Sequence, residues 1–270
     1  MASFDFDQAE GLRRMLAGPR PRVITFLSAT AEDDKGAMLV NLGASLAQAG
    51  TDVLVVDACQ REYGVARRLN LHKGPSLLQV ARQECALDEI VRAAPQGFSV
   101  ASLARIPRGG APMGEDDARR LANAFDVLAK QGATVLVDGE FGLDASFPVP
   151  LMATSEIVVQ VSTGAASISN ALALIKRLAQ HLGRRPFGLL VTGASEAQAQ
   201  VVYDNMAAAT SRYLAVPLVA MGSVPADEYL QRAARLGRAV VDAFPLAGAS
   251  VAFRQLAGRL APAGVGQAGR

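Results

Sequence analysis

Short apolar runs alternate along the chain with longer segments of helical periodicity. Val23–Leu27 has the length and composition of a buried strand. A polar loop follows it, and then a helical pattern covers Lys35–Ala49. The next apolar run, Val53–Val56, closes on Asp57. Strands that are apolar on both faces and separated by helices are typical of a parallel sheet covered by helices on both sides.

The same alternation continues through the rest of the chain, without an internal repeat or a long linker. It predicts one α/β domain over residues 23–260, built on a doubly wound, mostly parallel sheet. The further strands that we expect are Phe98–Leu103, Thr134–Val137, Glu156–Val161, Phe187–Val191 and Val216–Met221. The further helices that we expect are Ser76–Gln83, Leu87–Ala93, Asp116–Lys130, Ala165–Leu182, Gln198–Tyr213, Glu228–Leu236 and Val251–Leu260.

The two ends of the chain differ from this body. Residues 1–18 predict an amphipathic helix, with Leu12 and Leu16 on one face. Gly18 and the two prolines of the linker 19–22 break the chain after it. The tail 261–270 is rich in glycine and alanine, and we expect it to be disordered.

Composition excludes several classes of protein. Half of the 270 residues are hydrophobic, which excludes a disordered chain, and the net charge of +2 argues against a protein that coats nucleic acid. No apolar run approaches the roughly 20 residues of a membrane span. Cys59, Cys85, His72 and His181 are too few and too scattered for a disulfide framework or a zinc site. We therefore expect a cytoplasmic protein without a metal site.

The loop after the first strand has the position and length of a phosphate-binding loop. Such a loop follows the pattern G-x-x-x-x-G-K-[ST], in which glycines let the backbone surround phosphate and the hydroxyl binds Mg²⁺. Lys35 is in place, but Ala29 and Asp34 occupy the glycine positions and Gly36 occupies the hydroxyl position. Glu32–Asp34 adds three carboxylates where a triphosphate would lie, and we interpret this run as a solvated acidic loop.

The wider pattern resembles the MinD/ParA family of deviant-Walker ATPases over about residues 22–260. The helix KGAMLVNLGASLAQAG is similar to the family's first helix, and VLVVDA and VLVDGEFG are similar to its switch I and Walker B strands. Asp57 matches the first switch I aspartate and Asp138 matches the Walker B aspartate. The resemblance implies a P-loop NTPase-like fold and a degenerate nucleotide site made of Lys35, Asp57 and Asp138.

Departures from the family pattern affect each part of the catalytic apparatus. Thr30 stands where the family has the lysine that crosses the ATP-bound dimer, and Cys59 replaces the second switch I aspartate. Gly36 offers no hydroxyl to Mg²⁺, and Thr192 or Gly193 replaces a nucleotide-recognising asparagine. From these departures we expect a monomer that holds no cofactor and lacks ATPase activity.

The N-terminal segment matches the motif D-Q-A-x-x-L-R at every fixed position. The matching residues are Asp7, Gln8, Ala9, Leu12 and Arg13. This motif is similar to that of the FlhG/FleN branch of the family, which controls flagellar number and placement in bacteria. The resemblance implies that these residues bind an FlhF-type GTPase and stimulate its GTP hydrolysis.

We therefore expect a degenerate FlhG-type regulator of flagellar assembly that works by binding proteins. Flagellar transcription or basal-body proteins are further candidate partners, and a partner would recruit the chain to the flagellar base or the inner membrane face. Direct contact with nucleic acid is not expected, and membrane contact through the last helix would be weak. Two alternatives remain: a functional MinD/ParA-type ATPase that uses ATP and Mg²⁺ through an atypical loop, and a repurposed ParA-like protein with non-flagellar cargo.

Overall fold

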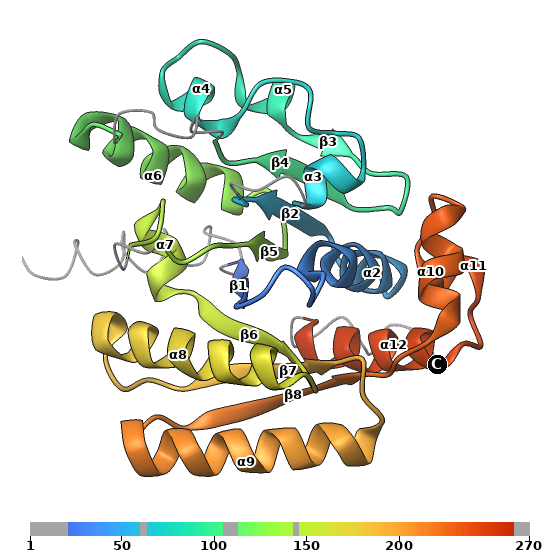
Figure 1. The fold of residues 1–270 in the computed structure, drawn as a ribbon. Helices are drawn as coiled ribbons and strands as arrows, with labels where there is room; N and C mark the ends of the chain where they lie inside the picture. The colour runs from blue at the N-terminus through green and yellow to red at the C-terminus, as the bar shows by residue number, and fades with distance from the viewer. Residues whose placement is uncertain (1–20, 60–63, 105–112, 143–145, 262–270) are drawn as a thin grey trace, which may run out of the picture.

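The computed structural model describes residues 21–59, 64–104, 113–142 and 146–261. In these ranges the chain forms one eight-stranded sheet with helices on both faces (Figure 1). The predicted α/β fold with a mostly parallel sheet is confirmed. The strands are β1 (Arg22–Ser28), β2 (Val53–Asp57), β3 (Arg92–Ala93), β4 (Ser99–Ser102), β5 (Thr134–Asp138), β6 (Glu156–Ser162), β7 (Phe187–Thr192) and β8 (Leu218–Val224).

The strand order places the ends of three strands beside one another. The order is β3-β4-β2-β5-β1-β6-β7-β8, and every neighbouring pair is parallel except β3 and β4. Asp138 at the end of β5 lies opposite Asp57 on β2 and opposite Phe26 on β1. Ligands of open α/β sheets bind at the carboxyl ends of strands, so this edge is where a site is expected.

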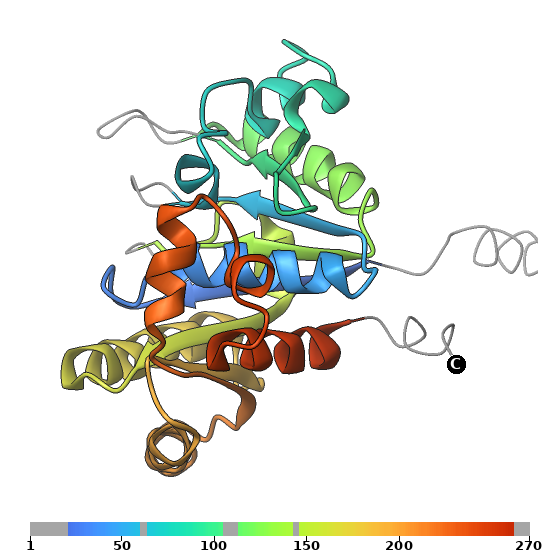
Figure 2. The ribbon, with the colours of Figure 1, turned by 90° about the vertical axis from the view of Figure 1, so that its right-hand side faces the viewer.

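One face of the sheet is covered by the first long helix and the last elements of the chain, which Figure 2 shows nearest the viewer. Leu39, Leu42 and Leu46 of the first helix are fully buried there, and Phe253 of the last helix joins the same cluster. The helices of this face are α2 (Lys35–Gln48), α3 (Val65–Arg68), α10 (Glu228–Arg235), α11 (Val240–Ala243) and α12 (Gly248–Leu260).

The opposite face carries two separate apolar clusters. One packs α6 and its neighbours around Phe125, and the other packs α8 and α9 around Phe187. The helices of this face are α4 (Leu77–Ala81), α5 (Leu87–Ile90), α6 (Glu115–Ala129), α7 (Pro150–Thr154), α8 (Ala165–Leu182) and α9 (Glu196–Leu214). With helices on both faces, the strands are buried from both sides, which explains their uninterrupted apolar sequences.

The structure corrects one predicted helix and adds three short ones. The helix expected over Leu87–Ala93 ends at Ile90, and Arg92–Ala93 instead forms the edge strand β3. These two residues pair with Val100 and Ser99 of β4, a contact between separate segments that the local pattern does not show. The elements α3, α7 and α11 have only four or five residues each, too few to show a periodicity.

The start of the described chain belongs to the sheet. Arg22, expected in the linker, is the first residue of β1 and donates to both carboxylate oxygens of Glu156, at 2.7 and 2.8 Å. It also donates to the backbone carbonyls of Arg259 and Leu260 at the end of α12. The predicted helix 1–18 and most of the predicted tail lie outside the described residues. No helix in the described ranges has the length and apolar character that crossing a membrane requires.

Candidate functional site

The three residues of the predicted nucleotide site meet at the carboxyl edge of the sheet. Lys35 begins α2, directly after the loop that follows β1. Its Nζ lies 2.7 Å from Oδ1 of Asp138. It also donates to the backbone carbonyl of Phe26 at 3.3 Å and to that of Gly139. The contact with Asp138 is an ion pair and not a hydrogen bond, so two of the three N–H donors of the ammonium group have acceptors among the described residues.

Backbone amides satisfy the two carboxylates from the other side. Asp57 accepts hydrogen bonds from the amides of Cys59, at 3.0 Å, and Ala66, at 2.8 Å. Asp138 accepts one from the amide of Val65, at 3.0 Å. A Cβ atom on Gly64 would lie only 2.5 Å from an Asp57 carboxylate oxygen, so this approach of the backbone requires glycine. The short helix α3 therefore serves to bring its first amides onto the acidic pair.

The acidic pair is buried and carries more negative charge than Lys35 neutralises. Asp138 is 1% exposed and Asp57 is 8% exposed. Burial, and then the neighbouring charge of Asp138, raise the pKa of Asp57 to about 6, although the amides of Ala66 and Cys59 and the charge of Lys35 act in the opposite direction. This cluster can hold a proton on Asp57 near pH 6, and the charge of Lys35 is already engaged by Asp138.

The loop before Lys35 is held by a third buried acid. Asp33 is 6% exposed, and the hydroxyl of Ser167 at the start of α8 lies 2.9 and 3.0 Å from its two carboxylate oxygens. The hydroxyl of Ser28 lies 3.1 Å from one of them. The side-chain amide of Gln160 on β6 donates to the backbone carbonyl of Asp33. Since Asp33 is buried, the prediction of a solvated acidic loop is wrong for this residue.

The other two acids of the loop have different roles. Asp34 accepts a hydrogen bond from the amide of Ala37, at 3.3 Å, and so caps α2. Its φ of 46° is left-handed, a conformation that aspartate tolerates better than most residues other than glycine. Arg68 of α3 forms an ion pair with it. Glu32 is exposed. The three carboxylates therefore do not face one common space.

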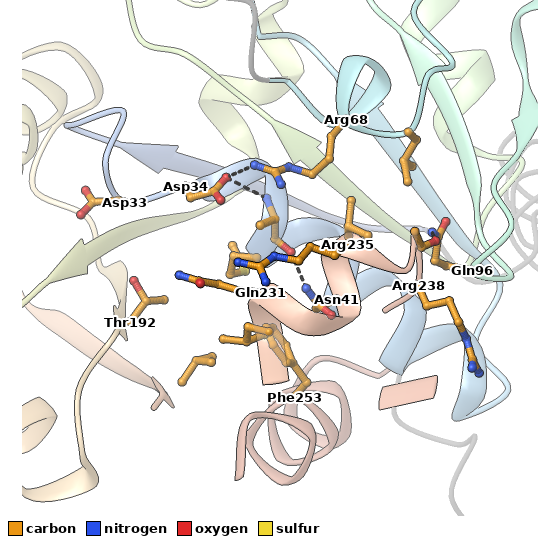
Figure 3. A pocket seen from close by; sticks show the side chains of 18 of the residues that line it. Asp33, Asp34, Asn41, Arg68, Gln96, Thr192, Gln231, Arg235, Arg238 and Phe253 are labelled. Atoms are coloured by element: carbon orange, nitrogen blue, oxygen red, sulfur yellow. Dashed lines mark hydrogen bonds and ion pairs between the residues drawn. The ribbon is translucent and has the colours of Figure 1, made fainter. Parts of the chain in front are cut away.

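Two cavities flank this loop and share only Asp34 in their walls. The smaller one, of about 580 Å³, is lined by Lys35 and Asp138, by the segment 140–142, and by α8 residues that include Arg177. The larger one, of about 790 Å³, lies over α2 and is bordered by α10 (Figure 3). Thr192 and Gly193, one of which we expect to replace the family's nucleotide-recognising asparagine, line the larger cavity and not the smaller.

Sequence reasoning missed the partners of the loop. Ser167 and Gln160 lie more than 120 positions from Asp33 in the chain, and no motif connects them. Only the pairing of β1 with β6 could have indicated these contacts, and the order of the elements along the chain does not predict that pairing. The partner-binding residues predicted in the N-terminal segment are Asp7, Gln8, Ala9, Leu12 and Arg13, and they lie outside the described residues.

Comparisons with known proteins agree on the fold and on the type of protein. No protein-family model matches the sequence. The antiactivator FleN of Pseudomonas aeruginosa is 29% identical over 219 residues, which cover 81% of this chain and 78% of that protein. The MinD cell division protein of Aquifex aeolicus superposes with a TM-score of 0.66 at 17% identity, over 88% of this chain and 96% of that one. MinD of Pyrococcus horikoshii, solved with Mg-ADP, superposes with a TM-score of 0.64 at 17% identity, over 88% and 95%.

Proposed function

The chain belongs to the MinD/ParA family, in its FlhG/FleN branch, and from this premise we propose that it regulates flagellar number by binding proteins rather than by turning over ATP. The observation that carries the proposal is the similarity to the antiactivator FleN over four-fifths of the chain. The proposed regulator is degenerate, because its nucleotide loop has been rebuilt from residues that serve the fold.

The residues of the loop do not fit a magnesium-bound triphosphate. Lys35 is already paired with Asp138 and donates to Phe26 and Gly139, and Gly36 has no hydroxyl to bind a metal ion. Asp34 places a carboxylate where the family's loop has glycine, and like charges about 4 Å apart repel by roughly 4 kcal/mol near a protein surface. These features support a function that does not depend on hydrolysis, even though relatives of this fold bind Mg-ADP.

The proposed principal partner is an FlhF-type GTPase, bound through the D-Q-A-x-x-L-R segment. Gly18 and Pro19 separate this segment from β1, so it can act without a rearrangement of the sheet. An isolated helix of about 13 residues is marginal in water, and we expect the segment to become helical on its partner. Leu12 would then supply the apolar contact and Gln8 and Arg13 the polar ones.

A hydrolysis assay tests the partner. The full-length chain, added to the FlhF-type GTPase of the same organism, should raise the rate of GTP hydrolysis. Gln8→Ala and Leu12→Asp should abolish the effect, whereas Glu10→Ala, at a variable position of the motif, should retain it. An unchanged rate with the full-length chain would remove the proposed partner, and equal activity of all three variants would remove the motif as its binding element.

A titration and a genetic test separate this function from the alternatives. Isothermal titration with Mg-ATP should show no tight binding, and light scattering should show a monomer with and without ATP, because Thr30 replaces the lysine that crosses the family's dimer. A low-micromolar dissociation constant, or a doubling of mass, would favour the ATPase alternative. Deletion of the gene should change the number of flagella per cell, and an unchanged number would favour non-flagellar cargo.

A further inference from the structure

The larger cavity combines an apolar lining with two arginines. Its volume of about 790 Å³ lies within the range of roughly 300–1,000 Å³ that is usual for sites that enclose a ligand. The apolar side chains of the lining include Met38, Leu69, Val224, Leu230 and Phe253. Arg235 and Arg238 also line it, and Figure 3 shows Arg235 reaching over it from α10. The cavity therefore suits an occupant that carries both apolar and acidic side chains.

The two arginines have no acidic partner in the part of the chain that the structure describes. Arg238 donates to the backbone carbonyl of Asp242, at 3.0 Å, and neither Arg235 nor Arg238 forms an ion pair with a described carboxylate. Both side chains are exposed. A guanidinium group can bind a carboxylate through two parallel hydrogen bonds, so each of these arginines can hold an acidic residue of an occupant.

The acids that line the same cavity are already held by other residues. The carboxylate of Asp33 contacts the hydroxyl of Ser167, and Asp34 is paired with Arg68, the third arginine of the lining. The charge that is left without a partner around the cavity is therefore positive. A positive rim favours an acidic occupant over a neutral or basic one.

The first residues of the chain have the complementary pattern. Residues 3–7 have the sequence S-F-D-F-D, in which Phe4 and Phe6 alternate with Asp5 and Asp7. An extended backbone points alternate side chains to opposite sides, so the two rings share one side and the two carboxylates the other. Aspartate is a favoured helix cap, and a helix that begins at Asp7 leaves Phe4 and Phe6 outside it. The D-Q-A-x-x-L-R motif assigns no role to these two phenylalanines.

The chain is long enough to bring this run to the cavity. Arg22, at the start of β1, contacts the end of α12, so the preceding segment leaves the sheet beside the face that carries the cavity. The cavity lies at the other edge, about 23 Å away along the seven residues of β1. The 14 residues from 8 to 21 span up to about 46 Å when extended, or about 28 Å if residues 8–17 are helical.

We infer that residues 3–7 of this chain bind in the larger cavity of their own domain, with Phe4 and Phe6 on its apolar lining and their neighbouring aspartates on Arg235 and Arg238. A short tether supplies an effective concentration on the order of millimolar, so weak contacts suffice to hold the segment. In this bound state the N-terminal segment is kept against the body of the protein. The inference does not rest on the proposed function, because neither the contact nor its test involves a GTPase.

A single tryptophan reports whether the segment is bound. The chain contains no tryptophan, so Phe4→Trp gives the full-length protein one such residue at the tested position. A tryptophan among apolar side chains emits at a shorter wavelength than one in water, and acrylamide quenches it less. We expect both differences relative to the free peptide of residues 1–20 with the same substitution. Equal emission and equal quenching in protein and peptide would overturn the inference.

Charge reversal tests the two arginines. In the Phe4→Trp protein, Arg235→Glu combined with Arg238→Glu should lower the ratio of bound to free segment by roughly tenfold or more, as expected for lost hydrogen bonds between charged groups. The emission should then move towards that of the free peptide. Arg184→Glu combined with Arg212→Glu is the matched control, because both arginines are exposed and lie outside the cavity. An equal response of the two double variants would overturn the inference.

A second reversal separates a direct contact from a change in the fold. Asp5→Arg combined with Asp7→Arg exchanges the charges on the side of the segment. Added to the reversal of the two arginines, it should restore the emission at shorter wavelength, because each pair again has opposite signs. A variant that merely disturbed the cavity would not be rescued in this way, and failure to recover the emission would overturn the inference.

Dilution distinguishes the chain's own segment from that of a second copy. Binding within one molecule does not depend on protein concentration, so the emission of the Phe4→Trp protein should stay constant on serial dilution. A shift to longer wavelength on dilution would mean that a second copy supplies the segment, and it would overturn the inference. Because these measurements use no GTPase, their failure leaves the partner proposal standing.

Discussion

The two sides of the loop between β1 and α2 differ in the kind of interaction that holds their buried polar groups. On the side of Lys35, the ammonium is paired with Asp138 and donates to two backbone carbonyls, and the carboxylates of Asp57 and Asp138 accept backbone amides. On the other side, the neutral amide of Gln160 donates to the backbone carbonyl of Asp33, whose carboxylate contacts the hydroxyl of Ser167. The first side is therefore held by charge and the second by hydrogen bonds from neutral groups.

The two buried acids at this loop also differ in the chemistry of their partners. Asp138 is held by an ammonium group and Asp33 by two hydroxyls, although both are almost fully buried. A hydrogen bond to a neutral hydroxyl is weaker than one to a charged group, so the two acids should contribute unequally to stability. The predictions that follow are ordered by the size of the effect that we expect.

Removal of the lysine should have the largest effect. Lys35→Met leaves Asp57 and Asp138 without their cation, and breaking a buried ion pair by deleting one partner costs about 3–5 kcal/mol. Urea unfolding should show this loss in the free energy of unfolding. Lys176→Met, an exposed lysine of α8, should change it by less than about 0.5 kcal/mol. Equal effects of the two variants would mean that the buried pair adds nothing to stability.

The buried acidic pair should also make stability depend on pH. The folded protein holds the Asp57 proton with a pKa of about 6, against 3.8 as the ordinary value. The folded state therefore binds more protons than the unfolded state between these values, and this contribution is full below pH 4 and lost as the pH rises through 6. Its size is at most about 3 kcal/mol.

Asp57→Asn isolates this contribution, because asparagine does not titrate. Urea unfolding of both proteins at several pH values gives the difference in their free energies of unfolding. That difference should shift in favour of the variant between pH 4 and 6 and stay constant above. A difference that does not change with pH would show that Asp57 keeps an ordinary pKa in the fold.

Removal of the second acid should cost less. Asp33→Ala deprives the hydroxyl of Ser167 of its acceptor, and such a loss costs about 1–3 kcal/mol. The hydroxyl of Ser28 keeps the backbone carbonyl of Thr30 as its acceptor, at 2.6 Å. Glu32→Ala, the exposed neighbour on the same loop, should have little effect on the free energy of unfolding. A gain in stability from Asp33→Ala would mean that the buried carboxylate strains the loop, and the contrast between the two acids would then be reversed.

The fold could be predicted largely from local patterns. Buried strands such as Thr134–Asp138 are apolar on both faces, and long helices such as Ala165–Leu182 repeat their apolar positions, so both leave a clear mark in the sequence. The helix at Val65–Arg68 leaves no such mark in the sequence, because it is stabilised by the contact of its amides with two carboxylates that are distant in the chain.

The candidate site was predictable only in part, for the same reason. Lys35, Asp57 and Asp138 each follow a strand, and parallel strands end at one edge, so their meeting could be expected. The burial of Asp33 could not, because it depends on Ser167 and Gln160 across the β1–β6 pair. The separation of the two cavities depends on the same burial of Asp33, so it could not be predicted from the sequence either.

The ion pair at the boundary of the two cavities should have the smallest effect. Arg68 and Asp34 are 33% and 50% exposed at their side chains, and exposed pairs contribute about 0.2–1 kcal/mol. Arg68→Ala leaves the hydrogen bond between Asp34 and the amide of Ala37 in place, so α2 keeps its cap. The loss in the free energy of unfolding should vanish in 1 M salt, where the screening length falls to about 3 Å. Arg67→Ala, a neighbouring exposed arginine, is the matched control. If Arg68→Ala alone lowered the free energy of unfolding by more than about 2 kcal/mol, the boundary between the cavities, and not only its surface charge, would depend on this arginine.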